Sequence, residues 1–162
     1  MSQLAPIAAL YDYILGLHIM AVVVAFGVTF AYPIMFAVGA KRDPRSLPVL
    51  HRIEYTIERV LINPGLLVVL LAGAYLASKG HDWSEFFVQW GLGAVVVIGA
   101  VVGAVMIPTA KKAEQLAERD LAGGDGGEMS AEYQAAVKRL TTFGSLLSVL
   151  VLVTILFMAV KP

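Results

Sequence analysis

Apolar residues gather into four long runs along this chain of 162 residues. The runs cover residues 13–38, 61–78, 86–108 and 142–160, and none contains Asp, Glu, Lys or Arg. An uncharged apolar stretch of about 18 residues or more is typical of a transmembrane helix. The pattern therefore predicts an all-α, polytopic membrane protein, with residues 1–162 forming one four-helix bundle and no separate soluble domain.

The amino-acid composition agrees with this prediction and excludes several kinds of functional site. Apolar residues make up 59% of the chain, and the mean hydropathy is +0.79. There is no cysteine, which excludes disulfides, thiolate metal sites and cysteine nucleophiles. The first six residues carry no Lys or Arg, so we expect the first run to be retained as a helix and not removed as a signal peptide.

The basic residues predict the orientation of the four helices. Of the twelve Lys and Arg residues, only Lys79 and Lys161 lie outside segments 39–60 and 109–141. Loops rich in Lys and Arg stay in the cytoplasm, so both segments are expected there as helical extensions. We therefore predict a multi-pass protein of the inner (plasma) membrane, embedded in the lipid bilayer, with both termini outside the cytoplasm. Several Tyr and Trp residues fall at the outer interface in this arrangement, which suits their amphipathic rings.

The sequence also predicts local irregularities. Pro33 should kink or unwind the first helix near its cytoplasmic end, and Asn63 followed by Pro64 has the pattern of a helix start with a bend. The 39–60 segment is amphipathic, which fits either a helix lying at the inner interface or an extension of the second span. Within it, Glu54 and Glu58 are interpreted as an ion-paired anchor with Arg52 and Arg59.

Small residues offer faces for close helix packing. Gly99 and Gly103 form a G-x-x-x-G pair in the third run, and Ala21 and Ala25 form a similar face in the first. Such faces allow two helix backbones to approach closely. They predict either packing inside the bundle, which we favour, or a homo-oligomer. Nothing in the sequence indicates a nucleic-acid partner.

His18 is the only histidine inside a predicted span, and the spans contain no Asp, Glu, Lys or Arg. An ionisable group within a membrane is costly and is by default a candidate functional site. A neutral imidazole there can ligate haem iron or another metal, or relay a proton; alternatively, it hydrogen-bonds a backbone carbonyl. His81, in the short 79–85 loop, is a candidate second ligand or a solvated residue, whereas His51 lies on the cytoplasmic side. No span contains a carboxylate, which argues against an ion pump.

The stretch from about residue 14 to 108 resembles the four-helix, haem-binding type of bacterial protoporphyrinogen IX oxidase and, more distantly, the copper-resistance membrane domain of the CopD kind. The residues that carry the resemblance are Leu17-His18-Ile19, Phe26-Gly27, Pro33, Phe36, Glu58-Arg59, Pro64 and Gly73. Three positions depart from the oxidase pattern: Ala25 replaces a tryptophan, Ile34 replaces an arginine, and Gln89 lies where a lysine is expected. The chain is most similar to an uncharacterised group of predicted bacterial four-helix membrane proteins related to these.

The resemblance implies a haem b site with His18 as the iron ligand. It therefore implies a role in electron transfer or haem-linked oxidation, while the departures weigh against the oxidase reaction itself. The alternative class is a non-enzymatic membrane module that packs against a partner protein or lipid. The sequence assigns no catalytic residue and no redox partner.

Overall fold

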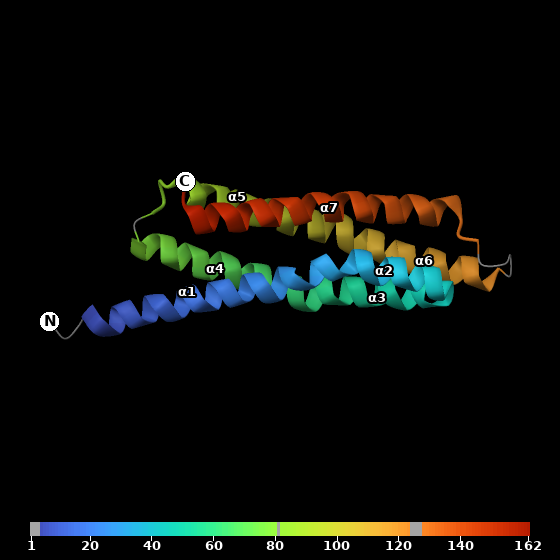
Figure 1. Ribbon diagram of the computed structural model, residues 1–162, viewed down its shortest axis with the longest axis horizontal. Coiled ribbons are helices and arrows are strands. Elements are labelled where there is room, and N and C mark those ends of the chain that lie inside the picture. Colours follow the sequence, from blue (N-terminus) through green and yellow to red (C-terminus); the bar gives the residue numbers. More distant parts are fainter. Residues whose placement is uncertain (1–3, 81, 124–127) are drawn as a thin grey trace.

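The computed structural model describes residues 4–80, 82–123 and 128–162, with side chains from residue 9 onward. Within these residues the chain is almost entirely helical, and no strand occurs. Four long helices form an elongated bundle (Figure 1). The start of α1, the α4–α5 connection and the end of α7 lie at one end of the bundle, which we call the terminal end (Figure 1).

The long helices are built from successive segments. The first comprises α1 (Leu4–Gly27) and α2 (Tyr32–Arg42). The second comprises a short 3₁₀ turn, α3 (Leu47–Ile57) and α4 (Asn63–Gly80). The third comprises α5 (Phe86–Val101) and α6 (Ile107–Ala122), and the fourth is α7 (Ala131–Val160).

Three of the long helices change helical type just before a proline. A 3₁₀ turn, Val28–Ala31, precedes Pro33, and π-helical turns precede Pro64 and Pro108. Proline has no N–H and its ring crowds the carbonyl four residues earlier, so a local change of helical period accommodates it. The predicted unwinding before Pro33 is confirmed. α4 begins at Asn63, but the predicted N-cap role of Asn63 is wrong, because Asn63 has helical backbone angles and follows a π-turn without a break.

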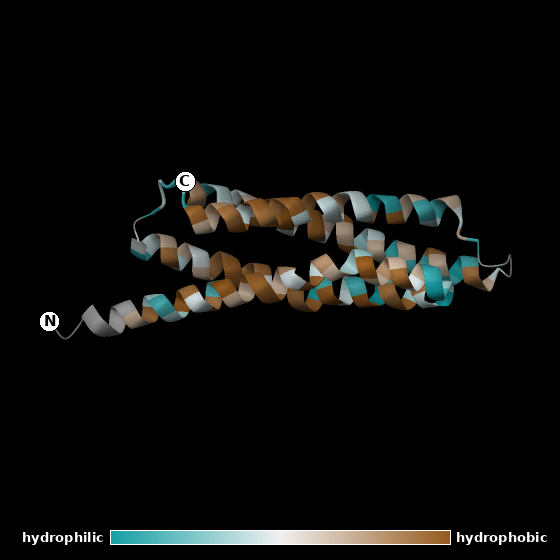
Figure 2. Cartoon of the chain, viewed as in Figure 1, coloured by the Kyte–Doolittle hydropathy of each residue, from teal (hydrophilic) through white to brown (hydrophobic). Residues whose placement is uncertain are grey.

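The helices are longer than a bilayer is thick. The second and third each run for 37 residues, which is roughly 55 Å against a hydrocarbon core of about 30 Å. Hydrophobic residues dominate near the terminal end, and hydrophilic residues gather toward the α6–α7 connection (Figure 2). The four predicted spans fall inside the four candidate membrane helices, and these helices continue past the spans toward the hydrophilic end.

The 39–60 segment is one of these extensions. Pro44–Gly80 is continuous helix, and α3 packs against α6. Of the two predicted alternatives, the extension of the second span is therefore correct and the interfacial helix is wrong. The bundle has two hydrophobic cores. One lies in mid-bundle around Phe26, Ile62 and Ile98. The other lies in the extensions around Ala113, Ala117 and Tyr133.

A close approach of two helices joins α1 to α4. A Cβ atom built on Gly65 would lie 2.6 Å from the Cβ of Ala25, which is 1% exposed. The small-residue face of Ala21 and Ala25 therefore packs within the chain, as favoured above, and Ala25 is not available to a second copy. A Cβ on Gly103 would meet no atom within 4 Å. An oligomer contact through Gly99 and Gly103 stays a prediction.

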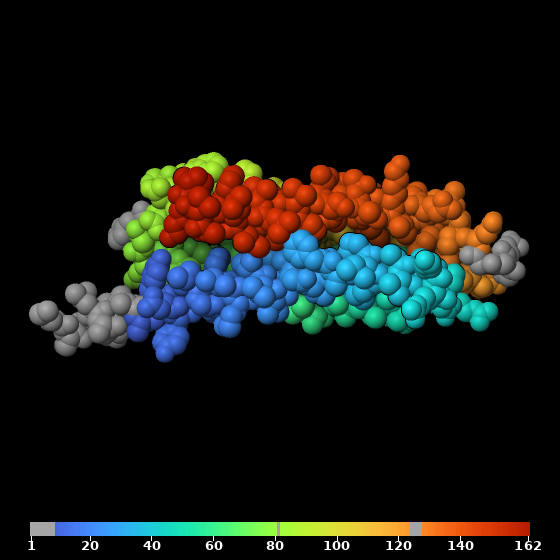
Figure 3. Space-filling view, in the orientation of Figure 1, coloured from blue at the N-terminus to red at the C-terminus, as the bar shows by residue number. Residues whose placement is uncertain are grey.

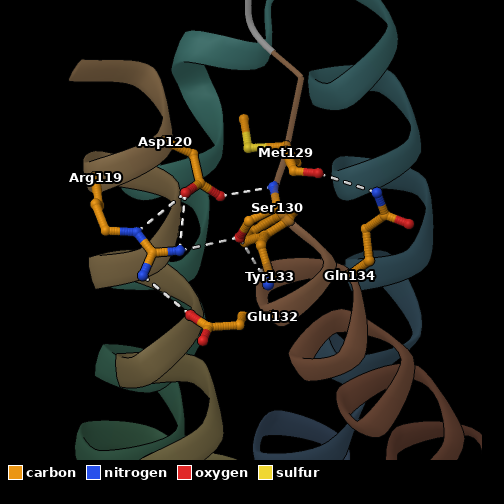
Figure 4. Close-up of polar contacts among 7 residues, drawn as sticks. All are labelled: Arg119, Asp120, Met129, Ser130, Glu132, Tyr133 and Gln134. Atoms are coloured by element: carbon orange, nitrogen blue, oxygen red, sulfur yellow. Dashed lines mark hydrogen bonds and ion pairs between the residues drawn. The ribbon is translucent and has the colours of Figure 1, made fainter. Parts of the chain in front are cut away.

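A polar network closes the hydrophilic end of the bundle (Figure 4). The side chain of Ser130 accepts a hydrogen bond from the backbone N–H of Tyr133 and so caps α7. The backbone N–H of Ser130 donates to Asp120 at 2.8 Å, and Arg119 bonds both Asp120 and Glu132. Hydrogen bonds from Ser130, reinforced by Arg119, hold the pKa of Asp120 below its ordinary value. The network ties the end of α6 to the start of α7.

Candidate functional site

His18 lies on the face of α1 that packs against α4. Its Nδ1 is 3.1 Å from the carbonyl oxygen of Val69. Because a carbonyl only accepts, Nδ1 carries the hydrogen and donates it. The neutral ring then has its lone pair on Nε2, the nitrogen left free for a ligand. The alternative anticipated from sequence, a hydrogen bond to a backbone carbonyl, is thus present, and it is compatible with ligation.

Gly73 makes room for the imidazole. A Cβ atom on Gly73 would lie 3.2 Å from Cε1 and 3.6 Å from Nδ1 of His18. The distance to Cε1 is tighter than most Cβ contacts and that to Nδ1 is an ordinary van der Waals contact, so a side chain here would press on the ring. Gly73 and Val69 are one helical turn apart on α4, and together they fix the position of the ring and its tautomer.

A cavity of about 420 Å³ adjoins His18. We call it the His18 cavity; it lies among α1, α4, α5 and α7. Its walls are mainly apolar, with Val22, Phe87 and Val95 among them. Tyr11, Asp82 and Lys161 add polar groups at the terminal end, and Met158 contributes a thioether. Cavities of about 300–1,000 Å³ with apolar walls and a few polar groups are typical of small-molecule and cofactor sites.

Protein side chains alone do not make a metal site here. Among residues 4–80, 82–123 and 128–162, no group of three or more His, Cys, Asp or Glu side chains could hold an ion. One imidazole beside an apolar cavity instead suits a metal that brings its own ligands, as haem iron does. The proposed second ligand, His81, lies outside the described residues.

A second cavity, of about 820 Å³, lies toward the hydrophilic end between α2, α3 and α7. We call it the Glu58 cavity. Its walls include His51, Glu54 and Glu58, which fall on one face of the α3 helix and its extension. All three side chains are buried, with exposed fractions of 1%, 4% and 2%.

His51 bridges two of the long helices through a buried chain of hydrogen bonds. Its Nδ1 is 3.1 Å from Glu54 and its Nε2 is 3.1 Å from the hydroxyl of Tyr133 on α7. A carboxylate only accepts, so Nδ1 donates to Glu54, and in the neutral ring Nε2 accepts from Tyr133. Phe36 packs on the imidazole with ring centroids 4.6 Å apart. The chain satisfies both ring nitrogens and joins α3 to α7.

The ion-paired anchor expected from sequence is wrong. Arg52 points to the neighbouring α6 and pairs with Glu114 and Glu118, not with Glu54 or Glu58. Glu54 bonds His51, and Oε2 of Glu58 has no partner among the described residues. The spacing of residues 51, 54 and 58 is the sequence feature that could have predicted this buried cluster. These side chains share one helical face, and polar residues near a membrane tend to face the interior of a bundle.

The fold places this chain in the class of all-helical membrane proteins: a bundle of four helices that are long and apolar enough to cross a membrane and continue beyond their apolar spans. The family model described as predicted integral membrane protein (DUF2269) matches residues 12–162. This chain belongs to that family. No curated protein and no solved structure matches it, so the likeness to the oxidase and to the CopD-type domain stays a prediction.

Proposed function

We propose that this protein binds haem b in the His18 cavity and serves in electron transfer or haem-linked oxidation. The observation that carries the proposal is the hydrogen bond from Nδ1 of His18 to the carbonyl of Val69. Iron-ligating histidines characteristically donate their other ring N–H to a carbonyl or carboxylate, which fixes the tautomer and orients the ring. His18 thus has the tautomer and the orienting contact that a proximal ligand needs.

The surroundings of His18 fit an apolar cofactor with polar edges. Val22, Phe87 and Val95 provide apolar walls that exclude water. Lys161 and Tyr11 would offer donors to acidic groups of a bound cofactor. Met158 lines the same cavity, and its thioether would be a further donor to iron. Bound haem would supply one-electron redox chemistry, while the chain orients the iron ligand and excludes water.

The absorption spectrum tests this proposal. Protein purified in detergent from haem-replete cells is expected to show a Soret band. His18→Ala should lose it entirely, because no other imidazole among the described residues lines the cavity. Leu17→Ala, at a largely lipid-facing position next along α1, is the matched control and should keep the band.

Two outcomes would count against the haem site. A colourless wild-type preparation that elutes as a folded species would contradict it and favour the non-enzymatic membrane module. An unchanged Soret band in His18→Ala would move the iron ligand elsewhere. If the two variants give equal gel-filtration profiles, loss of the Soret band in His18→Ala reports loss of haem and not loss of the fold.

We further propose that the protein lies in the inner membrane with both termini outside the cytoplasm. The described parts of both basic segments, 39–60 and 109–141, lie toward the hydrophilic end of the bundle (Figure 2). Positively charged segments are retained in the cytoplasm, which supports this orientation.

The orientation predicts the behaviour of reporter fusions. Alkaline phosphatase, which is active only outside the cytoplasm, is expected to be active when fused after Pro162 and inactive when inserted at Asp43, between α2 and α3. A fluorescent protein that matures only in the cytoplasm should give the opposite pattern at the same two sites. A cytoplasmic C-terminus would refute the orientation.

A further inference from the structure

The Glu58 cavity combines buried carboxyl groups with aromatic walls. Glu54 and Glu58 both line it, and the aromatic rings of Phe26, Phe30 and Phe36 form part of its wall. No Lys or Arg is among the residues described as lining it. Buried acidic groups are normally paired or hydrogen-bonded, because an unpaired one is costly. Among the described residues, the cavity walls therefore carry carboxyl groups but no Lys or Arg side chain that could pair with them.

Two buried oxygen atoms, on residues that line this cavity, have no hydrogen-bond partner among the described residues. Oε2 of Glu58 and the hydroxyl of Tyr32 accept or donate no hydrogen bond among the described residues. The two residues are 2% and 8% exposed, and both line the cavity. In a folded protein such groups call for an explanation, and a ligand that supplies donors is one.

Two basic residues on the same long helix as Glu58 already have partners. Arg52 bonds Glu114 and Glu118 on the outer side of α3 and α6. Both nitrogens of His51 are occupied by Glu54 and Tyr133. Neither Arg52 nor His51 therefore supplies a hydrogen-bond donor to Oε2 of Glu58.

We infer that the Glu58 cavity binds a protonated amine that carries an apolar body, with its N–H groups donating to Glu58 Oε2 and the Tyr32 hydroxyl. The phenylalanine rings contact the apolar body and face the cation, since the face of an aromatic ring attracts positive charge. A bare metal ion fits less well, because no group of three or more His, Cys, Asp or Glu side chains in the described ranges could hold one. This site is separate from the His18 cavity and does not depend on haem binding.

The cavity has a route of entry. Its walls come from the first long helix on one side and from α7 on the other. A space-filling view shows a groove between these two elements along one face of the bundle (Figure 3). An amphipathic amine partitions to the membrane interface and can enter laterally through this groove, with its charge directed toward the hydrophilic end.

Binding of three matched probes to the full-length protein in lipid nanodiscs tests the inference. The probes are 4-phenylbutylamine, its neutral analogue 4-phenylbutanol, and its trimethylammonium analogue, which has no N–H. Isothermal titration calorimetry is corrected with empty nanodiscs. The amine should bind about ten-fold or more tightly than either analogue, because a hydrogen bond to a charged group contributes that much.

Substitutions test which residues of the cavity bind the amine. Glu58→Gln keeps the shape and removes the charge, so it should weaken amine binding by about ten-fold or more. Tyr32→Phe removes only the hydroxyl and should weaken binding by about three-fold or more. Glu114→Gln is the matched control: this glutamate is also buried but pairs with Arg52 outside the cavity, and binding should be retained.

Several results would overturn the inference. Equal affinity for the amine and the alcohol would show an apolar cavity without a cation site. Amine binding that survives both Glu58→Gln and Tyr32→Phe would place the amine elsewhere, and no binding of any probe would refute the site. Because these readouts do not involve absorption by haem, they stand or fall independently of the Soret experiment.

Discussion

Gly65→Ala is expected to lower the free energy of unfolding by about 1–3 kcal/mol, the usual cost of forcing an extra group into a packed interface. The added methyl would lie 2.6 Å from the Cβ of Ala25 and 3.6 Å from its Cα. Neither atom is the mobile end of a long side chain, so the clash can be relieved only by moving α1 away from α4. These helices share the contact that holds His18 against Val69 and Gly73.

The matched control is Gly93→Ala. A Cβ on Gly93, in α5, would meet no atom within 4 Å. Alanine is a better helix former than glycine by about 1 kcal/mol, so this variant should be neutral or slightly stabilised. Thermal unfolding in one detergent, followed by tryptophan fluorescence, measures both. Equal stability of Gly65→Ala and Gly93→Ala would show that α1 and α4 do not pack through Gly65.

The sequence predicts the membrane helices well because their signal is local. Four uncharged runs define the spans, and composition alone separates them from the extensions. The change of helix type before Pro33 also follows from one residue, since proline cannot donate its backbone hydrogen bond. By contrast, the pattern Asn63–Pro64 did not predict that the helix continues without a break from α3 through a π-turn into α4.

The polar interior of the Glu58 cavity could not be predicted in the same way. Arg52 and Arg59 flank Glu54 and Glu58 in the sequence, which suggests pairing along one helix. The structure instead sends Arg52 to α6 and turns Glu58 inward. Which face of the 39–60 helix is covered depends on where α6 and α7 lie, and only the three-dimensional arrangement supplies that information. His18 was found from sequence, whereas its partner Val69 was not, because a backbone carbonyl has no sequence signal.

The two cavities share a boundary that links them physically. Phe26, Ile98 and Val151 line both, and all three belong to the mid-bundle core. This apolar layer separates the imidazole of His18 from the carboxyl groups of the Glu58 cavity. A chain of protein hydrogen bonds between the sites would have to cross that layer, where these residues offer no polar side chain. The two cavities are therefore best regarded as separate and not as parts of one proton relay.

Gly73→Val is expected to abolish the Soret band proposed for the wild-type protein, although Gly73 is not a ligand. A Cβ at this position already lies 3.2 Å from Cε1 of His18. The two methyl groups of valine extend to both sides of that atom, so the ring must turn away and lose its hydrogen bond to Val69. Haem content per folded protein, measured after gel filtration, reports the effect, with Gly93→Val as the control at a position where a Cβ meets nothing within 4 Å. Gly93→Val should keep the band. If the wild-type protein is coloured and Gly73→Val stays equally coloured, the iron ligand is not the His18 ring held in this position.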